Sequence, residues 1–293
     1  RDEEKVEYEE VIEKVHKHRL TKDGRQGDNI LLSICIPSYN RGKRAYENVV
    51  HTLNSEFDEE IEVVVSNNGS IDANKGYYKK ISELEDSRVV YFEFEKNNIL
   101  PFNLNKISEI ANGKYLLYIS DEDLVNLNEL SKLINILRSE GQTFSVVRTR
   151  TDGQGHVPFY GIAKAGVDAL YNFMLTSNYL SGLIYNREQI KRHELMKYTL
   201  KNIDKSIAHK YYTHVIWEMI LCQYGPVLGL DLVLINEGIP EVGDNKMDDG
   251  KIIIPSYATL ESRIEQHKSF FDVIGDLEIS INDPDIHRNL YKK

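Results

Sequence analysis

The stretch YLLYISDED, residues Tyr115 to Asp123, decides the fold expected for this chain. Its first half is a run of apolar and aromatic residues, typical of a buried strand, and it ends abruptly in Asp121, Glu122 and Asp123. Carboxylates at the C-terminal end of a buried strand build a site of hard oxygen ligands, which suits Mg²⁺ or Mn²⁺ shared with phosphate oxygens. An acidic triplet can also be a solvated turn that caps the next helix, so the surrounding sequence must decide.

The surrounding segments alternate between strand and helix patterns. Fully apolar runs separated by amphipathic helices predict an α/β fold, with a Rossmann-like, mostly parallel sheet and helices on both faces. Ligands of such sheets bind where the carboxyl ends of the strands open. The other expected strands are 31–37, 61–66 and 89–95, and the expected helices are 46–53, 77–84 and 103–111.

Composition and charge disfavour some classes of partner. The formal net charge is -10 and no long run of Lys or Arg occurs, which disfavours a nucleic-acid partner. Cys35 and Cys222 lie inside apolar runs, which indicates reduced core thiols and a cytoplasmic protein. No segment approaches the roughly 18 to 20 apolar residues of a membrane span. Peripheral association with the inner face of the membrane stays open.

A polar loop, PSYNRG, follows the first predicted strand. Pro37 is expected to end the strand ladder, because it lacks an N–H group. Tyr39 offers a flat face on which a base or a sugar can stack, and Asn40 and Arg41 add polar groups. Taken alone, a loop of this kind is more often a turn than a ligand site.

A second polar loop, SNNGSID, follows the next strand. Asn67 and Asn68 carry amides suited to a uracil edge, and Gly69 permits a tight turn. Ser70 or Asp72 can cap the following helix. Three polar loops on one sheet edge indicate a ligand site rather than three unrelated turns.

These motifs resemble those of the family 2 glycosyltransferases, which have the GT-A fold. The resemblance rests on PSYNR at 37–41, VVVSNNGSID at 63–72 and NKISEIANGKYLLYISDED at 105–123, in that order and each in its strand context. It implies a hexosyl- or N-acetylhexosaminyl-transferase that uses a nucleotide sugar, commonly UDP-linked, together with Mn²⁺ or Mg²⁺. It also implies transfer with inversion to a hydroxyl of a glycan or other surface polymer.

The resemblance assigns donor-site roles to individual residues. Tyr39 and Asn40 would line the nucleoside, and the loop from Asn67 to Ser70, with Asn68 and Gly69, would hold the base. Asn105 matches the polar residue that opens the helix before the acidic motif. The remaining donor-loop residues carried over are Pro37 and Arg41.

The acidic motif departs from the family pattern. Ser120 replaces the first acid of the common quartet. We expect Asp121 to address the ribose or the metal, Asp123 to be the principal metal ligand, and Glu122 to be a side contact or a helix-entry charge. Leu104 stands where relatives often have an arginine, which leaves the diphosphate to the cation and to Arg41 or Arg44.

An inverting transfer needs a base that accepts the proton of the acceptor hydroxyl. The segment YYTHVIWEMILCQYG, 211–225, resembles the helix that supplies this base, but His214 occupies the neighbourhood of the expected acid. His214 and Glu218 are four residues apart and share a helix face, so the carboxylate could orient an imidazole base, or the histidine could complete a metal shell. The alternatives are a surface ion pair or a core histidine, and Asp204 is the fallback base.

We divide the chain into four regions. An N-terminal helix and linker occupy 1–29, and the apolar stripe of the helix predicts docking to a partner or to a second subunit. A nucleotide-sugar-binding half at 30–150 is followed by an acceptor-binding, catalytic and largely helical half at 151–240, in which Ser181 and Gly182 could let an acceptor sugar approach the backbone. A C-terminal loop and helical extension occupy 241–293.

Two other functions stay open. A nucleotidyltransferase would show a Gly-rich, basic phosphate loop after the first strand, and PSYNRG is a poor version of one. A nucleotide-sugar-binding module without turnover is suggested by Ser120 and by the uncertain base.

Overall fold

The description of the fold rests on a computed structural model. The residues that it describes are 30–57, 60–71, 75–139, 143–153, 159–173, 179–239 and 259–292, together with Gly24 and Gly141. The predicted N-terminal helix at 1–20 and Asp72 lie outside the described residues.

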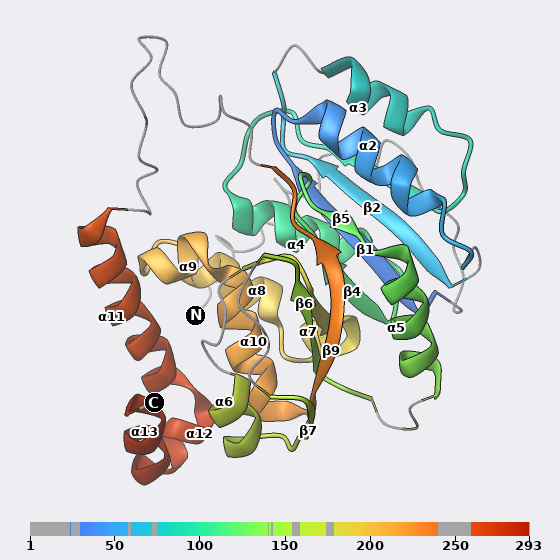
Figure 1. The fold of residues 1–293 in the computed structure, drawn as a ribbon. Helices are drawn as coiled ribbons and strands as arrows, with labels where there is room; N and C mark the ends of the chain where they lie inside the picture. The colour runs from blue at the N-terminus through green and yellow to red at the C-terminus, as the bar shows by residue number, and fades with distance from the viewer. Residues whose placement is uncertain are drawn as a thin grey trace.

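A nine-stranded sheet forms the centre of the molecule (Figure 1). The strand order is β3-β2-β1-β4-β8-β6-β9-β5, and β7 pairs with β9. The first four strands are parallel, as predicted, whereas β8 runs antiparallel to β4 and β6. The strands are β1 (Leu32–Ser38), β2 (Ile61–Asn67), β3 (Val89–Glu93), β4 (Tyr115–Tyr118), β5 (Leu124–Val125), β6 (Val146–Thr151), β7 (Gly161–Ala163), β8 (Leu183–Asn186) and β9 (Val227–Asn236).

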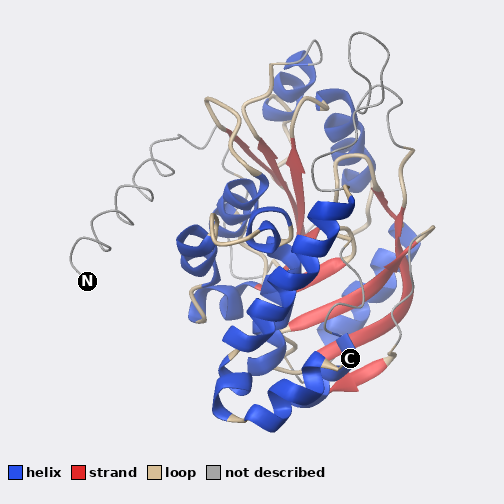
Figure 2. Ribbon diagram, turned by 90° about the vertical axis from the view of Figure 1, so that its left-hand side faces the viewer, coloured by secondary structure: helices blue, strands red, loops and turns tan. Residues whose placement is uncertain are grey.

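Helices cover both faces of the sheet, as the sequence predicts. Helices α2, α3 and α5 pack on one face, and α4, α8, α9 and α10 pack on the other (Figure 1). Seen from the side of α11, the C-terminal helices lie outside those that cover the sheet (Figure 2). The helices are α2 (Gly42–Leu53), α3 (Lys75–Ser82), α4 (Leu100–Ile110), α5 (Leu127–Ser139), α6 (Val167–Phe173), α7 (Arg187–Arg192), α8 (Leu195–Asn202), α9 (Ile207–Tyr211), α10 (Thr213–Tyr224), α11 (Leu260–Asp276), α12 (Glu278–Asn282) and α13 (Pro284–Tyr291).

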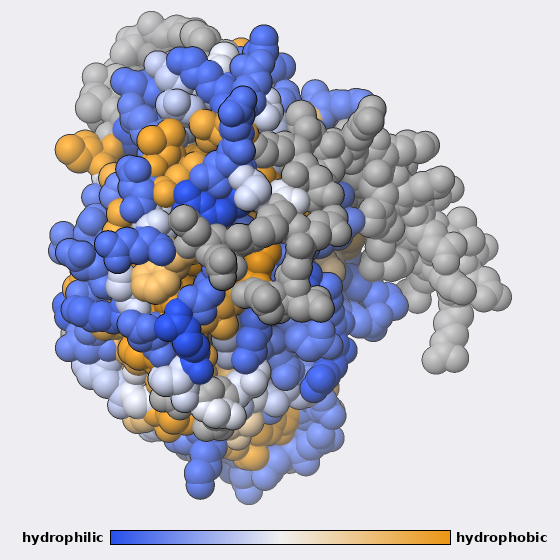
Figure 3. All heavy atoms as spheres, turned by 90° about the vertical axis from the view of Figure 1, so that its right-hand side faces the viewer, coloured by the Kyte–Doolittle hydropathy of each residue, from blue (hydrophilic) through white to orange (hydrophobic). Residues whose placement is uncertain are grey.

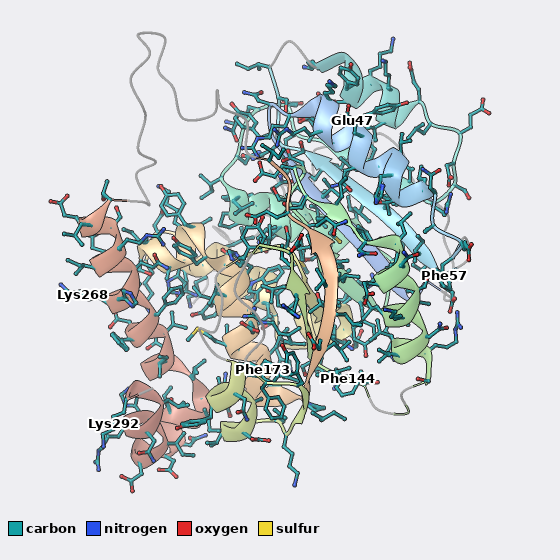
Figure 4. All side chains as sticks on the ribbon, viewed as in Figure 1. Glu47, Phe57, Phe144, Phe173, Lys268 and Lys292 are labelled. Atoms are coloured by element: carbon teal, nitrogen blue, oxygen red, sulfur yellow. The ribbon has the colours of Figure 1, made fainter. Side chains whose placement is uncertain are left out.

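Two apolar clusters, one on each face, form the core. Alternate residues of a strand point to opposite faces, so Ile34 and Ile36 join one cluster and Cys35 joins the other. Phe144 and Phe173, labelled in Figure 4, belong to different clusters on the two sides of the sheet. The surface in Figure 3 is mostly hydrophilic with scattered apolar patches, which is ordinary for a globular domain.

Strand register brings the predicted loops to one edge. Ser38 of β1 pairs with Asn67 of β2, and Cys35 of β1 pairs with Tyr118 of β4, so the loops after these strands meet at the carboxyl edge. Pro37 does not end the strand as expected. The ladder between β1 and β4 ends at Cys35, but β1 itself continues to Ser38. Within the described residues, no helix combines the length and the apolar character needed to cross a bilayer. Both cysteines are free and buried, as expected.

Candidate functional site

The acidic residues after β4 lie at this carboxyl edge and contact the loop after β1. Asp121 accepts a hydrogen bond from the Ser38 hydroxyl at 2.6 Å and one from Arg41 Nη1 at 3.2 Å. The same Arg41 nitrogen lies 3.2 Å from Glu122 Oε2, and Arg44 Nη1 lies 3.4 Å from that oxygen. One guanidinium nitrogen therefore bridges two neighbouring carboxylates.

Burial changes the acid–base properties of this cluster. Asp121 is 4% exposed, and loss of solvent raises its pKa to about 6 although Arg41 and the Ser38 hydrogen bond oppose the shift. The negative charge of Glu122 adds to the increase. A cation beside Asp121 favours its charged form, so the cluster is poised to bind positive charge.

Asp123 has a different environment from its two neighbours. It is 0% exposed, and its Oδ2 accepts hydrogen bonds from the Tyr179 hydroxyl at 2.8 Å and from the Ser181 hydroxyl at 2.6 Å. Its Oδ1 accepts one from the backbone N–H of Gly238 at 2.9 Å. The sequence predicts Asp123 as the principal metal ligand, but the structure directs this carboxylate into the protein. The Glu122 side chain, 20% exposed, is the most accessible of the three acids.

In the loop after β2, the side-chain amides of Asn67 and Asn68 hydrogen-bond to protein atoms. Asn67 Oδ1 accepts from Ser70 N at 3.0 Å, and Asn67 Nδ2 donates to the Tyr91 hydroxyl. Asn68 Nδ2 donates to Asn97 Oδ1 at 3.0 Å, and Asn68 Oδ1 accepts from Asn98 N. Both amides were predicted to read a uracil edge. In this structure they are buried and occupied by protein atoms, so they shape the loop instead.

The loops after β1 and β2 are locked to each other. Asn40, at φ 55°, accepts from Ile71 N with its side chain and donates its own N–H to Ser70 Oγ. Gly69 has φ 69°, and a Cβ there would lie 2.2 Å from the carbonyl carbon of Lys96, so only glycine fits. These contacts give the edge a fixed shape. Tyr39 remains 38% exposed beside it.

Asn105 and Leu104 lie on α4. Asn105 Nδ2 donates to the carbonyl of Met196 in α8, so its amide ties two helices together on one face of the sheet. The described contacts of its side chain do not include the acidic residues that it was predicted to accompany. Leu104 is buried in the core, where an arginine would meet no water.

The predicted base lies at the start of α10. This helix is joined to β9 by two residues, and β9 runs parallel to β6, so the first turn of α10 faces the carboxyl ends of these strands. His214 is buried in this turn, and its carbonyl accepts from the Tyr185 hydroxyl. The described hydrogen bonds of Glu218 go to Arg148 and not to His214. Both of its oxygens bind Arg148 of β6, at 2.5 and 2.7 Å, in a buried bidentate pair.

The fallback base and the acceptor segment are also placed. Asp204 is exposed in the turn between α8 and α9, next to Lys205, which pairs with Asp276 of α11. Ser181 is at the acidic turn through its bond to Asp123. Gly182 has φ 92° and follows it directly.

Several residues of this edge were not singled out from the sequence. Ser38 and Tyr78 hydrogen-bond to each other at 2.7 Å beneath Asp121. Tyr179 and Gly238 come from segments that approach Asp123 only in the folded chain. Ser38 and Tyr179 lie in the segments PSYNRG and TSNYLSG, close to residues that were singled out from the sequence, and only this position in the sequence pointed to them.

The donor set fits a divalent cation that substrate phosphates complete. Within the part of the chain that the structure describes, no group of three or more His, Cys, Asp or Glu side chains could hold a metal alone. Mg²⁺ is commonly held by one or two carboxylates together with substrate phosphates. Asp121 and Glu122 meet this requirement, since both already bind a positively charged nitrogen between them.

A family model decides the classification of the chain. The model described as "Glycosyl transferase family 2" matches residues 33–192, which include β1 from its second residue, β2 to β8, the acidic turn and both polar loops. The chain belongs to glycosyl transferase family 2. Its α/β fold of the GT-A type and its family, both predicted above, are thereby confirmed.

Curated relatives of this glycosyltransferase match over shorter stretches. Glycosyltransferase GlyG of Streptococcus pneumoniae is 29% identical over 103 residues, which are 35% of this chain and 34% of GlyG. The uncharacterized glycosyltransferase YfnE of Bacillus subtilis is 28% identical over 98 residues, 33% of this chain and 24% of YfnE. The matched part spans 34% of the length of GlyG and 24% of the length of YfnE.

Solved structures share the fold at low sequence identity. TarS of S. aureus, crystallised with UDP-GlcNAc, superposes with a TM-score of 0.60 at 16% identity and covers 85% of this chain and 68% of that chain. The mannosyltransferase PcManGT of Pyrobaculum calidifontis, in complex with GDP-Man and Mn²⁺, gives a TM-score of 0.54 at 14% identity, covering 98% and 76%.

Proposed function

We propose that this family 2 glycosyltransferase moves a sugar from a UDP-linked donor to a hydroxyl of a glycan or other surface polymer, with inversion and with Mn²⁺ or Mg²⁺. The observation that carries the proposal is the bridge of Arg41 between Asp121 and Glu122 at the carboxyl edge. Structural neighbours crystallised with UDP-GlcNAc, and with GDP-Man and Mn²⁺, support a nucleotide-sugar donor.

The residues of the edge take the following roles in this proposal. Asp121 and Glu122 hold the cation, and Arg41 and Arg44 turn toward the diphosphate. The bound cation stabilises the negative charge that develops on the leaving diphosphate. Tyr39 is the exposed ring offered to the nucleoside. Asp123 keeps the turn in place, a role that differs from the metal ligand predicted from the sequence.

His214 is the proposed base, because the first turn of α10 lies toward the same edge and an imidazole can accept a proton near neutral pH. In this proposal Glu218 stabilises α10 through its pair with Arg148. We place the reaction in the cytoplasm, at the inner face of the membrane where surface polymers are extended. Residues 1–29 keep their predicted role in docking a partner or a second subunit.

Calorimetric titration with UDP, with and without Mn²⁺, tests the proposal, followed by assay of a panel of UDP-sugars. Cation-dependent binding with slow donor hydrolysis supports the transferase. Cation-dependent binding without turnover of any donor supports the second candidate, a binding module, which Ser120 in place of the first acid favours. Turnover of nucleoside triphosphates would support the nucleotidyltransferase, and absence of UDP binding contradicts the proposal.

A further inference from the structure

The acidic motif is a tight turn whose two ends are fixed by one side chain. The turn runs from Ser120 to Asp123 and is closed by a hydrogen bond from Asp123 N to the Ser120 carbonyl at 3.1 Å. Ser181 Oγ accepts from Ser120 N at 2.8 Å and donates to Asp123 Oδ2 at 2.6 Å. One hydroxyl therefore contacts the first and the last residue of the turn.

Tyr179 adds a second hydroxyl to the last residue of the turn. It donates to the same Asp123 oxygen at 2.8 Å, and Gly238 N takes the other oxygen. Hydrogen bonds to a charged acceptor are stronger than neutral ones, and here the acceptor, Asp123, is fully buried. The carboxylate of Asp123 is thus held from three directions.

The central residues of this turn are Asp121 and Glu122. Their side chains leave the backbone in directions that the ends of the turn set, and both reach Arg41 Nη1 at 3.2 Å. A cation shared by two carboxylates and a diphosphate requires the carboxylates to be placed within a fraction of an ångström. Small displacements of Asp123 would therefore be felt at the cation.

We propose that Tyr179 and Ser181 are positioning residues for Asp121 and Glu122. They act through Asp123, and they hold the acidic turn in the shape that presents two carboxylates to the donor diphosphate and its cation. The inference rests on the proposed function. Tyr179 and Ser181 belong to the acceptor half of the chain, so the donor half depends on the acceptor half for its cation site.

The test uses the variants Tyr179→Phe and Ser181→Ala of the full chain. Mn²⁺ is titrated calorimetrically into protein saturated with UDP, and UDP is titrated into protein without cation. We expect each variant to weaken Mn²⁺ binding by about tenfold or more, because each loses one hydrogen bond to the charged Asp123. Ser181→Ala also loses the hydrogen bond from Ser120 N. UDP affinity without cation should change by less than about twofold, because the proposed function assigns neither residue a contact with the nucleotide.

Two variants serve as matched controls. Tyr224→Phe removes a tyrosine–carboxylate hydrogen bond of similar length, 2.9 Å to Glu278. Ser269→Ala removes a serine hydrogen bond to the carbonyl of Glu265. Both contacts belong to α10 and the C-terminal helices, so Mn²⁺ binding should be unchanged. Thermal unfolding of every variant checks that the fold is kept.

The outcomes distinguish a failure of the positioning role from a failure of the proposed function. Variants at Tyr179 and Ser181 that bind Mn²⁺ like the wild type overturn the positioning role and leave the proposed function intact. An equal fall of Mn²⁺ and UDP affinity also overturns it, because that pattern indicates general damage to the fold. A wild type that binds UDP under neither condition contradicts the proposed function, and the positioning role with it.

Discussion

Two arginine–carboxylate clusters of this molecule, around Arg148 and around Arg41, differ in geometry and in exposure. Arg148 binds one carboxylate, that of Glu218, through two nitrogens at 2.5 and 2.7 Å, and both side chains are buried. Arg41 binds two carboxylates, those of Asp121 and Glu122, through one nitrogen at 3.2 Å, and its side chain is partly exposed. The first cluster is fully buried, whereas the second, in which Arg44 also contacts Glu122, is partly exposed and faces the carboxyl edge.

This difference separates a structural pair from a binding site. A bidentate arginine–carboxylate pair uses the best geometry available to both groups, so Arg148 and Glu218 have little left to offer a ligand. In the proposed function, the 3.2 Å contacts of Arg41 to Asp121 and Glu122 are exchanged for contacts to a phosphate. A cation can then take the place between Asp121 and Glu122. We therefore propose that the first cluster stabilises α10 and that the second binds the donor.

Breaking the buried pair should give the largest effect. Glu218→Gln leaves the buried Arg148 guanidinium without a counter-charge, and we expect the free energy of unfolding to fall by about 3 to 5 kcal/mol. Urea denaturation at pH 7 measures this loss. The double variant Arg148→Met, Glu218→Leu should recover most of it, since neither charge is then left alone. A loss below about 1 kcal/mol for Glu218→Gln would show that the pair does not stabilise α10.

Neutralising one acid of the open cluster should change binding rather than stability. Glu122→Gln is expected to weaken Mn²⁺-dependent UDP binding about tenfold or more, because a cation loses a charged ligand. The free energy of unfolding should change by less than about 1 kcal/mol, since the side chain is partly exposed. Glu60→Gln, which removes a surface partner of Arg138, is the control. Unaltered cation-dependent binding in Glu122→Gln would move the cation away from this residue.

A third buried ionisable group, His209, differs from both arginine clusters, because its hydrogen-bond partners are neutral hydroxyls and not charged groups. Its ring nitrogens contact the Tyr198 and Ser206 hydroxyls, and burial, helped by Lys205, lowers its pKa to about 4. The folded protein thus resists protonation, so this contribution to stability is present above pH 6.5 and is lost as the pH falls toward 4.

The expected size of this effect is about 2 kcal/mol between pH 7 and pH 5. Urea denaturation of the wild type and of His209→Gln at both pH values measures it. The variant should lose less stability on acidification than the wild type. Parallel losses in the two proteins would show that His209 does not carry this pH dependence.

The strands and the edge could be predicted because their signals are local. Apolar runs such as Ile61–Asn67 specify buried strands by themselves, and parallel pairing then brings the following loops together. The turn at Gly69 could also be predicted, because glycine adopts positive φ without steric cost. The family motifs gave the order of these elements.

The use of individual side chains could not be predicted in the same way. Glu218 finds Arg148 seventy residues away in sequence, and Gly238 reaches Asp123 across an even longer separation. Nothing local to Asp123 indicates that it points inward while Glu122 points outward. Likewise, the amide of Asn68 serves the turn because Asn97 and Asn98 fold back onto it. Long-range partners decide which polar residues are left for a ligand.

A crystal structure with UDP and Mn²⁺ tests the central claim most directly. The account predicts a cation ligated by Asp121, Glu122 and diphosphate oxygens, with Arg41 turned from the carboxylates to a phosphate and Asp123 still bound to Tyr179 and Ser181. A nucleotide bound away from this edge, or a cation ligated by Asp123 instead of Glu122, would contradict it.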